Sequence, residues 1–488
     1  MNKKNKKNQN IIGDIMNKSI WNDIKASTKT PKKILETDIL IIGGGITGLT
    51  SLLYLSEQKK KATLIEANTL GSGITNKTTG KINIMQEYNY QTIEKITNKK
   101  TSQKYLESQI YITKEIINII KKYKIKCDLE KNYSYLFTND QKNIKKIIKE
   151  KQILSKYIKC ETITKLPNNY PCIYGIKTKS YTLNPIKYIK EIKNICKNNI
   201  YENTRALTIT KKLNKYLIKT NKNKILAKQI LICTHYPFIN KPFIPIKTTI
   251  EKEYIIAATP EKTYKANMIS NDNEIISIRY YKDKMIYTNN NSLLCNKLNH
   301  KKNMNNTIKN FKKHFNYPIT HTWYNYDIIS NDRLPIIGKI KKENIMIATA
   351  YNKWGMTNGI LAAKIMTDII NNKQNEYIEL VNPYRKTNKN KLINNCKYSY
   401  NNIKAYIKSR KQNNIKYKKE NGIEYAIYID KNNKEHKIIN KCPHLKCKLI
   451  LNELDQTWDC PCHGSRYTID GKVIKGPSNY SIIPKKNY

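Results

Sequence analysis

Arginine is scarce in this sequence although the chain is strongly basic. Of 90 lysine and arginine residues only six are arginine, against 37 acidic residues, and the formal net charge is +53. Proteins that grip phosphate groups bidentately favour arginine, so this composition argues against a dedicated nucleic-acid-binding surface. The lysines are also spread along the whole chain rather than clustered. We therefore predict no nucleic-acid partner.

Long hydrophobic runs are absent as well. The apolar-rich stretch 39–56 contains four glycines and is shorter than the roughly 20 apolar residues that a membrane-spanning helix needs. The segment Met1–Lys33 is polar and lysine-rich and lacks the apolar core of a secretory signal. We predict a cytoplasmic protein without a membrane span, whose charge would still allow peripheral contact with an anionic membrane.

Glycine is the second scarce residue, with 16 in 488 positions, about half of the usual frequency of roughly 7%. Most of the glycines fall in three groups, at 43–80, 338–359 and 464–476. Glycines that persist in such a composition mark places where the backbone needs them.

The first glycine group follows a short apolar run, 37–42, that predicts a buried parallel strand. Gly43, Gly45 and Gly48 fit the G-x-G-x-x-G pattern, in which they allow a tight turn, the approach of a pyrophosphate and close packing of the next helix. A helix over 49–58 and a strand over 62–65 follow, and Glu66 is placed to accept from ribose hydroxyls. This unit predicts a site for FAD or NAD at the helix N-terminus, with an ordinary glycine-rich turn as the alternative.

Later segments resemble the glycine/D-amino-acid oxidase family of flavoproteins. The resemblance is carried by Gly71–Lys81, Tyr201–Ala206, Leu231–Pro237, Asp332–Gly338 and Ala350–Gly359. It implies that the dinucleotide is FAD and that a helix over 357–370 points its N-terminus at the flavin. The residues that it implies for contact with FAD are Gly43, Gly45, Ile46, Thr47, Gly48, Glu66, Ser72, Thr79, Gly80, Ala206, Thr234, Gly338, Trp354, Gly355, Met356 and Thr357.

Cysteine is unevenly distributed. Most of the 11 cysteines are scattered and are explained as small core residues, whereas the last four lie close together near the C-terminus. Cys442 and His444 form a Cys-x-His motif, and Cys460 and His463 form a Cys-x-x-His motif. Two thiolates and two imidazoles would suit structural zinc.

The same motifs also resemble Rieske [2Fe-2S] proteins, and this resemblance favours an iron-sulfur cluster. It implies one iron bound by Cys442 and Cys460, the other by His444 and His463, and a disulfide between Cys447 and Cys462. It further implies that the hydroxyls of Ser465 and Tyr467 bond to cluster or ligand sulfurs. Lys446 stands where these proteins usually have glycine, and we expect a steric cost if it takes a positive φ.

The whole chain resembles bacterial proteins that fuse an amino-acid-oxidase-type flavin domain to a Rieske domain. We expect an α/β, Rossmann-like FAD-binding domain with an α+β cap domain, followed by a small all-β Rieske domain. The expected boundaries are a polar extension at 1–36, the flavin domain at 37–385 with a cap sheet around 241–330, a linker at 386–421 and the Rieske domain at 422–488. Within the flavin domain, 101–123 and 143–156 are expected to be helices.

The resemblance implies an FAD-dependent oxidoreductase, a dehydrogenase acting on CH–NH or CH–OH groups, that oxidises a small amine or amino-acid-like substrate. Electrons would pass from FAD to the cluster and then to an external acceptor. Arg279 is the candidate for binding a substrate carboxylate, and Tyr254, Tyr236 and Trp354 are candidates for lining the pocket. Two alternatives remain open: an electron-transfer or redox-sensing protein without substrate turnover, and a basic nucleic-acid-binding zinc protein.

Overall fold

The computed structural model describes residues 18–21, 24, 34–196, 199–239, 241, 243–272, 275–293, 299–408, 412 and 414–484. Most of the polar extension expected at 1–36 lies outside these residues. Trp21 within it is buried, donates its indole N–H to the carbonyl oxygen of Thr78 at 2.8 Å, and packs edge-on against Tyr281. This aromatic side chain therefore anchors the described residues 18–21 to the body of the protein.

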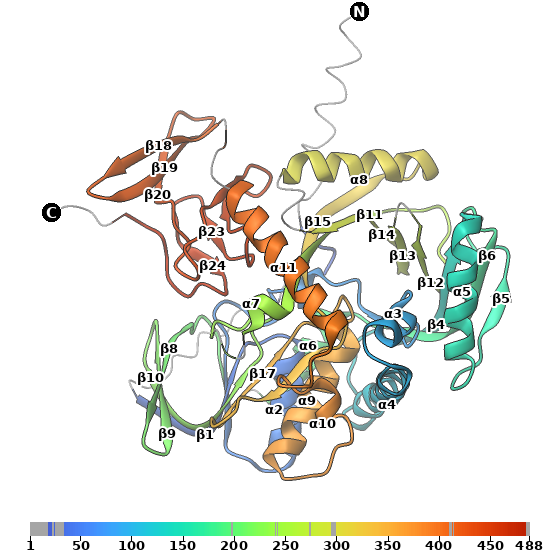
Figure 1. Cartoon of the computed structure of the whole chain (residues 1–488), viewed down its shortest axis with the longest axis horizontal. Helices are drawn as coiled ribbons and strands as arrows, with labels where there is room; N and C mark the ends of the chain where they lie inside the picture. Colours follow the sequence, from blue (N-terminus) through green and yellow to red (C-terminus); the bar gives the residue numbers. More distant parts are fainter. Residues whose placement is uncertain are drawn as a thin grey trace, which may run out of the picture.

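Parallel strands form the centre of the first large sheet (Figure 1). Strand β1 pairs in parallel with β2 on one side and β10 on the other, and β10 pairs in parallel with β17. The apolar run that predicted a buried strand lies in β1, where Leu40 and Ile41 are fully buried. The strands of this sheet are β1 (Ile34–Ile42), β2 (Ala62–Ile65), β7 (Ile200–Tyr201), β8 (Ala206–Lys212), β9 (Lys215–Thr220), β10 (Lys224–Ile232), β16 (Ile336–Lys339) and β17 (Ile345–Thr349).

Helices α2 (Ile46–Glu57) and α9 (Gly355–Ile370) pack against each other on this sheet. Their contact is close, because a Cβ on Gly359 would lie only 2.9 Å from Ile46 and Thr47. Both helices were predicted, and each begins slightly earlier than expected. The other helices of the described chain are η2 (Thr75–Lys77), α3 (Asn89–Ile96), α4 (Lys99–Lys122), α5 (Gln141–Leu154), α6 (Pro185–Ile195), α7 (Ile244–Lys247), α8 (His300–His314), α10 (Ile378–Val381) and α11 (Lys389–Lys408).

The second large sheet extends beyond the predicted cap region of 241–330. Its strand order is β15-β11-β14-β13-β12-β4-β6-β3, and β5 pairs with β6. Strands β3 to β6 come from residues 81–182, where the sequence predicted only the helices that appear as α4 and α5. The strands of this sheet are β3 (Lys81–Ile82), β4 (Glu130–Thr138), β5 (Glu161–Ile163), β6 (Tyr174–Thr182), β11 (Thr248–Ala258), β12 (Ala266–Asn271), β13 (Ile275–Tyr281), β14 (Lys284–Leu293) and β15 (Ile319–Ser330).

The C-terminal part contains two small antiparallel sheets. One is β18 (Lys416–Glu420), β19 (Ile423–Ile429) and β20 (Glu435–Ile439); the other is β21 (Ile450–Asn452), β22 (Thr457–Asp459), β23 (Arg466–Thr468) and β24 (Val473–Lys475). The predicted linker at 386–421 consists largely of the helix α11, and β18 lies at its end. The β-rich region thus begins before residue 422.

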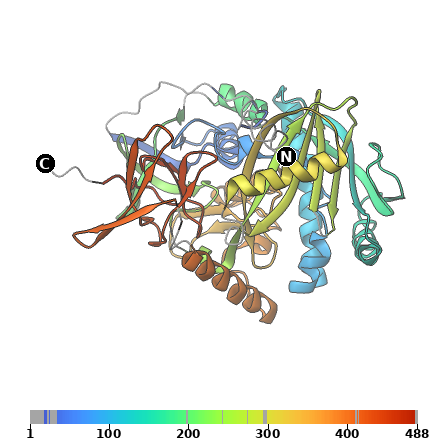
Figure 2. The same cartoon turned by 90° about the horizontal axis from the view of Figure 1, so that it is seen from above.

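The four-stranded C-terminal sheet, β21 to β24, lies against both large sheets (Figures 1 and 2). Towards the second sheet, Tyr326 donates to Asp459 at 3.0 Å and Asn452 donates to the hydroxyl of Tyr324 at 2.7 Å. Towards the first sheet, Arg205 and Asn68 both donate to the carbonyl oxygen of Ile474, at 3.1 Å each. The C-terminal region is therefore seated where the two large sheets meet.

Candidate active site

The turn after β1 uses backbone that glycine alone adopts without strain. Gly43 has a φ of +114°, and a Cβ there would lie 2.5 Å from the carbonyl oxygen of Cys233. A Cβ on Gly48 would overlap the carbonyl oxygen of Gly43, so α2 lies directly against the turn. The chain therefore passes at once from strand to helix, and the first turn of α2 borders the space in front of it.

Glu66 follows β2 and borders the same space. Its two carboxylate oxygens accept hydrogen bonds from the backbone N–H groups of Gly44, at 2.7 Å, and Asn68, at 2.8 Å. Burial raises the pKa of this carboxyl group, although the two amides oppose that shift. The glycine turn thus holds the Glu66 carboxyl group in place.

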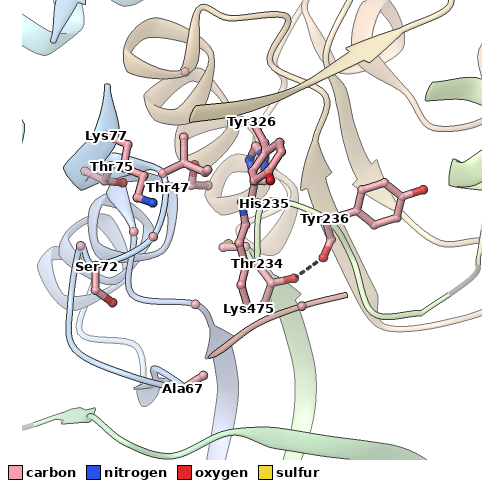
Figure 3. A pocket seen from close by; sticks show the side chains of 18 of the residues that line it. Thr47, Ala67, Ser72, Thr75, Lys77, Thr234, His235, Tyr236, Tyr326 and Lys475 are labelled. Atoms are coloured by element: carbon pink, nitrogen blue, oxygen red, sulfur yellow. Dashed lines mark hydrogen bonds between the residues drawn. The ribbon is translucent and has the colours of Figure 1, made fainter. Parts of the chain in front are cut away.

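A cavity of about 260 Å³ lies in front of the turn (Figure 3). Its wall combines the glycine turn, the loop after β2, the end of β10, strand β15, the start of α9 and the last loop of the C-terminal region. Most of the residues predicted to contact FAD line it, namely Gly43, Gly45, Ile46, Thr47, Glu66, Ser72, Thr79, Ala206, Thr234, Gly355 and Met356.

The remaining predicted contacts, which are Gly48, Gly80, Gly338, Trp354 and Thr357, are not among the described wall residues. Gly48 supports the turn, Gly80 at φ +69° makes room for Arg279, and Gly338 at φ +139° packs beside Pro383. Trp354 is the residue before α9, and the Thr357 hydroxyl donates to its carbonyl oxygen at 3.3 Å. Their small size or capping position matters for the fold around the cavity.

Arg279 does not have the position that a substrate-binding residue needs. It is 1% exposed on β13, and its terminal nitrogens donate to the carbonyl oxygens of Thr79 and Leu183. Burial lowers the pKa of its guanidinium to about 9. Arg279 is not among the described wall residues, and its two terminal nitrogens bind backbone carbonyls, one of them that of the wall residue Thr79. The prediction that Arg279 anchors a substrate carboxylate is therefore corrected to a structural role.

Tyr254 likewise belongs to the core. It is fully buried, and its hydroxyl lies 3.3 Å from His300 Nδ1 and 3.3 Å from the Asn303 amide nitrogen. Tyr236, by contrast, is part of the cavity wall. Its backbone carbonyl accepts a hydrogen bond from the Thr234 hydroxyl at 3.1 Å (Figure 3).

Several charged residues of the wall were missed from the sequence. Glu253 on β11, Asp327 on β15 and Lys353 before α9 all line the cavity. Burial would lower the pKa of Lys353, but Glu251, 3.0 Å from its Nζ, holds that pKa above its ordinary value. Burial, reinforced by the charge of Glu253, raises the pKa of Asp327 to about 7. No local motif marks these residues, because they are far apart in the sequence and meet only in the fold, two of them on strands of the second sheet and Lys353 before α9.

The C-terminal region contributes a further lysine to the wall. Lys475, at the end of β24, lies with its Nζ 4.8 Å from the centre of the Tyr326 ring. Burial lowers the pKa of Lys475 to about 7. The cavity wall therefore combines the glycine turn, which is near the N-terminus, with a residue near the C-terminus.

The structure brings the four predicted cluster ligands together. Cys442 and Cys460 are buried and not disulfide-bonded, and the Cys460 thiol donates to Cys442, which lowers the pKa of Cys442 to about 6. The rings of His444 and His463 lie 5.1 Å apart and nearly perpendicular. Burial lowers the pKa of His444 to about 4 and that of His463 to about 3, so both imidazoles are neutral, as metal ligands must be.

His463 supplies the sharpest sign of a metal site. Both of its ring nitrogens are buried and have no hydrogen-bond partner in the part of the chain that the structure describes. Buried polar atoms in proteins are nearly always paired, so two such nitrogens on one ring fit a histidine that binds metal. Together with the two free thiols and His444, they fit a Rieske cluster.

The loops around these ligands also follow the Rieske resemblance. Cys447 and Cys462 form a disulfide, and their sulfurs and that of Cys460 lie within 4.8 Å of one another. Lys446 has a φ of +61°, the conformation that was expected to carry a steric cost. The Tyr467 hydroxyl lies 3.3 Å from the sulfur of Cys442.

The cavity and the predicted cluster ligands meet at one residue. Tyr236, in the cavity wall, has its ring 5.3 Å from that of His463 and 6.1 Å from that of His444. The tyrosine is 4% exposed, so this contact is shielded from solvent. The sequence predicted Tyr236 only as a candidate for lining the pocket, and it did not predict the contact with the two histidines.

Comparison with known proteins identifies the family. Residues 38–369 match the model of the FAD dependent oxidoreductase family, and residues 404–484 match that of the Rieske [2Fe-2S] domain. The chain belongs to the FAD dependent oxidoreductase family. As a member of this family with a Rieske domain, it binds FAD and a [2Fe-2S] cluster.

Relatives of this FAD dependent oxidoreductase share its two-part organisation or its fold. The "Putative Rieske 2Fe-2S iron-sulfur protein YhfW" of Bacillus subtilis is 26% identical, over 93% of this chain and 95% of that protein. L-amino acid deaminase from Proteus vulgaris has a TM-score of 0.60 at 13% identity, over 75% of this chain and 100% of the deaminase. Glycine oxidase from Geobacillus kaustophilus has a TM-score of 0.60 at 11% identity, over 72% of this chain and 100% of the oxidase.

The sequence predicted no membrane span, and the structure tests this prediction for its helices. Within the described ranges, every helix falls short of the length and apolar character that crossing a bilayer requires.

Proposed function

We propose that the protein oxidises a small amine or amino-acid-like molecule in the FAD cavity, and that the electrons leave one at a time through the Rieske domain to an external acceptor. The contact between Tyr236 and His463 carries this proposal. It joins the wall of the FAD cavity to a cluster ligand within one chain and out of contact with solvent.

Bound FAD supplies two-electron chemistry and the [2Fe-2S] cluster supplies one-electron transfer. The chain's own residues position these groups. The glycine turn and the start of α2 suit the pyrophosphate of FAD, and Glu66 suits the ribose. Cys442, Cys460, His444 and His463 suit the two irons.

On the substrate side, Lys353 takes the role that Arg279 cannot fill. Its ammonium group lines the cavity and stays charged because Glu251 supports it, so it can bind a substrate carboxylate. Asp327 lines the same cavity, and its pKa is raised to about 7 by burial. It can therefore accept the proton that an ammonium substrate must lose before its nitrogen is oxidised.

The electron acceptor is proposed to approach the loop that carries His444. His444 is half-buried, and its neighbours Leu445 and Lys446 are exposed, whereas His463 is 6% exposed and faces Tyr236. The Tyr236 ring lies near both histidines, so the two differ mainly in exposure: His463 is enclosed and His444 lies nearer to solvent.

The test is anaerobic purification followed by visible spectroscopy with FAD, iron and sulfide analysis. Candidate amines and amino acids are then added one at a time. The proposal predicts that a substrate bleaches the flavin and then reduces the cluster, and that Lys353→Met raises KM most for substrates with a carboxylate. A matched control is Lys339→Met, an exposed lysine of β16 outside the cavity wall. If no candidate bleaches the flavin, the alternative of a redox sensor without turnover gains support.

A further inference from the structure

Helix α11 packs against the protein with its polar side. Lys391 forms an ion pair with Asp332 at 3.0 Å, and the Asn394 amide donates to the carbonyl oxygen of Asn331 at 2.6 Å. The Tyr398 hydroxyl donates to the carbonyl oxygen of Ser330 at 3.3 Å. An ordinary surface helix buries its apolar side and exposes its polar side, so α11 is inverted.

Five large apolar side chains of α11 face outward. Leu392, Ile393, Tyr400, Ile403 and Ile407 are between 55% and 63% exposed. Positions 392, 400, 403 and 407 follow the spacing of one helix face. Short helix α7 packs beside α11 (Figure 1) and adds Phe243, just before it, at 70% exposed and Ile246 at 47%. These apolar side chains of α11 and α7 are together called the α11 face below; concentrations of exposed apolar side chains of this kind mark interaction sites.

Charge indicates what covers this face. The sequence of α11 contains five lysines and no acidic residue, and Lys389 and Lys397 are exposed. A second copy of the chain would bring the same lysines and the same net charge of +53, so repulsion opposes self-association. An anionic bilayer offers the complementary surface, because apolar side chains enter the boundary between headgroups and acyl chains while lysines contact the headgroups.

We propose that the α11 face docks this protein on the surface of an anionic lipid bilayer. The helix lies in the plane of the interface and does not cross it. This inference rests on α11 and α7 alone, so it stands or fails independently of the substrate proposed above.

The test measures binding of the FAD- and iron-loaded protein to vesicles of phosphatidylcholine with or without phosphatidylglycerol. Wild-type protein should bind the anionic vesicles and release them at high salt. The double variant Lys389→Gln/Lys397→Gln should bind about twenty-fivefold more weakly, at about fivefold per lysine. The triple variant Tyr400→Ser/Ile403→Asn/Ile407→Asn should bind roughly a hundredfold more weakly.

Matched substitutions on the β8–β9 hairpin provide the control. Lys212 is exposed and Leu213 is 95% exposed. The variant Lys212→Gln/Leu213→Asn should bind vesicles within about twofold of wild type, because salt screens a single lysine that lies outside the docked face. FAD content, iron content and the visible spectrum show that each variant is folded. The proposal is overturned if the α11 variants bind like wild type or if the hairpin control weakens binding equally. It is also overturned if sedimentation shows a dimer that the triple variant abolishes while vesicles are not bound.

Discussion

Removing the hydroxyl of Tyr467 tests how the protein tunes its cluster. Tyr467 lies on β23, is fully buried, and places its hydroxyl 3.3 Å from the sulfur of Cys442, a proposed cluster ligand. A hydrogen bond to a ligand sulfur is stronger when the cluster carries the extra electron, so it favours the reduced state. Tyr467→Phe should therefore lower the reduction potential.

The size of the shift follows from the strength of one hydrogen bond. A typical net value is about 1 kcal/mol. For a one-electron couple, about 59 mV corresponds to a tenfold change in the equilibrium constant, or about 1.4 kcal/mol, so losing this bond should lower the potential by about 40 mV.

Protein-film voltammetry or a redox titration followed by EPR measures this shift directly. Tyr425→Phe is the control, because Tyr425 lies on β19 in the other small sheet and its ring contacts Lys437 rather than a cluster ligand. The control should keep the wild-type potential. A shift of less than about 10 mV in Tyr467→Phe, with an intact cluster spectrum, would refute the reasoning, since it is far below the value of one hydrogen bond.

Three further predictions concern the flavin turn, a buried acid and the disulfide. Gly48→Ala should abolish FAD binding or folding, because its Cβ would overlap the Gly43 carbonyl. The control Gly422→Asn, in the turn between β18 and β19 with no atom within 4 Å of its Cβ, should keep the wild-type ratio of flavin to protein, because Asn tolerates the positive φ of this position. Burial raises the pKa of Glu150 to about 7 from 4.5, so the folded state keeps a proton that the unfolded state loses. The free energy of unfolding should therefore fall as pH rises from about 4.5 to 7. The variant Glu150→Gln should flatten the dependence of the thermal midpoint on pH. The disulfide joins cysteines at a sequence separation of 15, so Cys447→Ser/Cys462→Ser should lower the free energy of unfolding by roughly 3 kcal/mol. Cluster absorbance should then be lost faster in urea, and an unchanged rate would contradict this prediction.

Local motifs carried most of what the sequence predicted. The strand, glycine turn, helix and acid at 37–66 follow one another directly, with β1 paired to β2 and Glu66 accepting from Gly44, so their pattern is readable in one stretch of chain. The cysteines and histidines at 442–463 are likewise confined to two loops, and the structure brings them together as the Rieske resemblance implied.

What escaped prediction depends on contacts between distant segments. Strand β4 pairs in parallel with β12 in the second sheet, so Phe137 meets its partner Ser270 only once the long intervening chain has folded. Arg279 looked like a binding residue because arginine is scarce, yet it supports backbone carbonyls at Thr79 and Leu183. Lys353 and Tyr236 gain their positions from the second sheet and the C-terminal region, which no local pattern describes.

We propose that electrons pass from FAD to the Rieske cluster within one chain. Flash photoreduction of the flavin under anaerobic conditions, followed by the visible spectrum of the cluster, measures this step at several protein concentrations. The expected result is a first-order rate that does not change with protein concentration, that persists in Tyr236→Phe and that falls in Tyr236→Leu. A rate proportional to protein concentration, or a cluster that stays oxidised while the flavin is reduced, would contradict it.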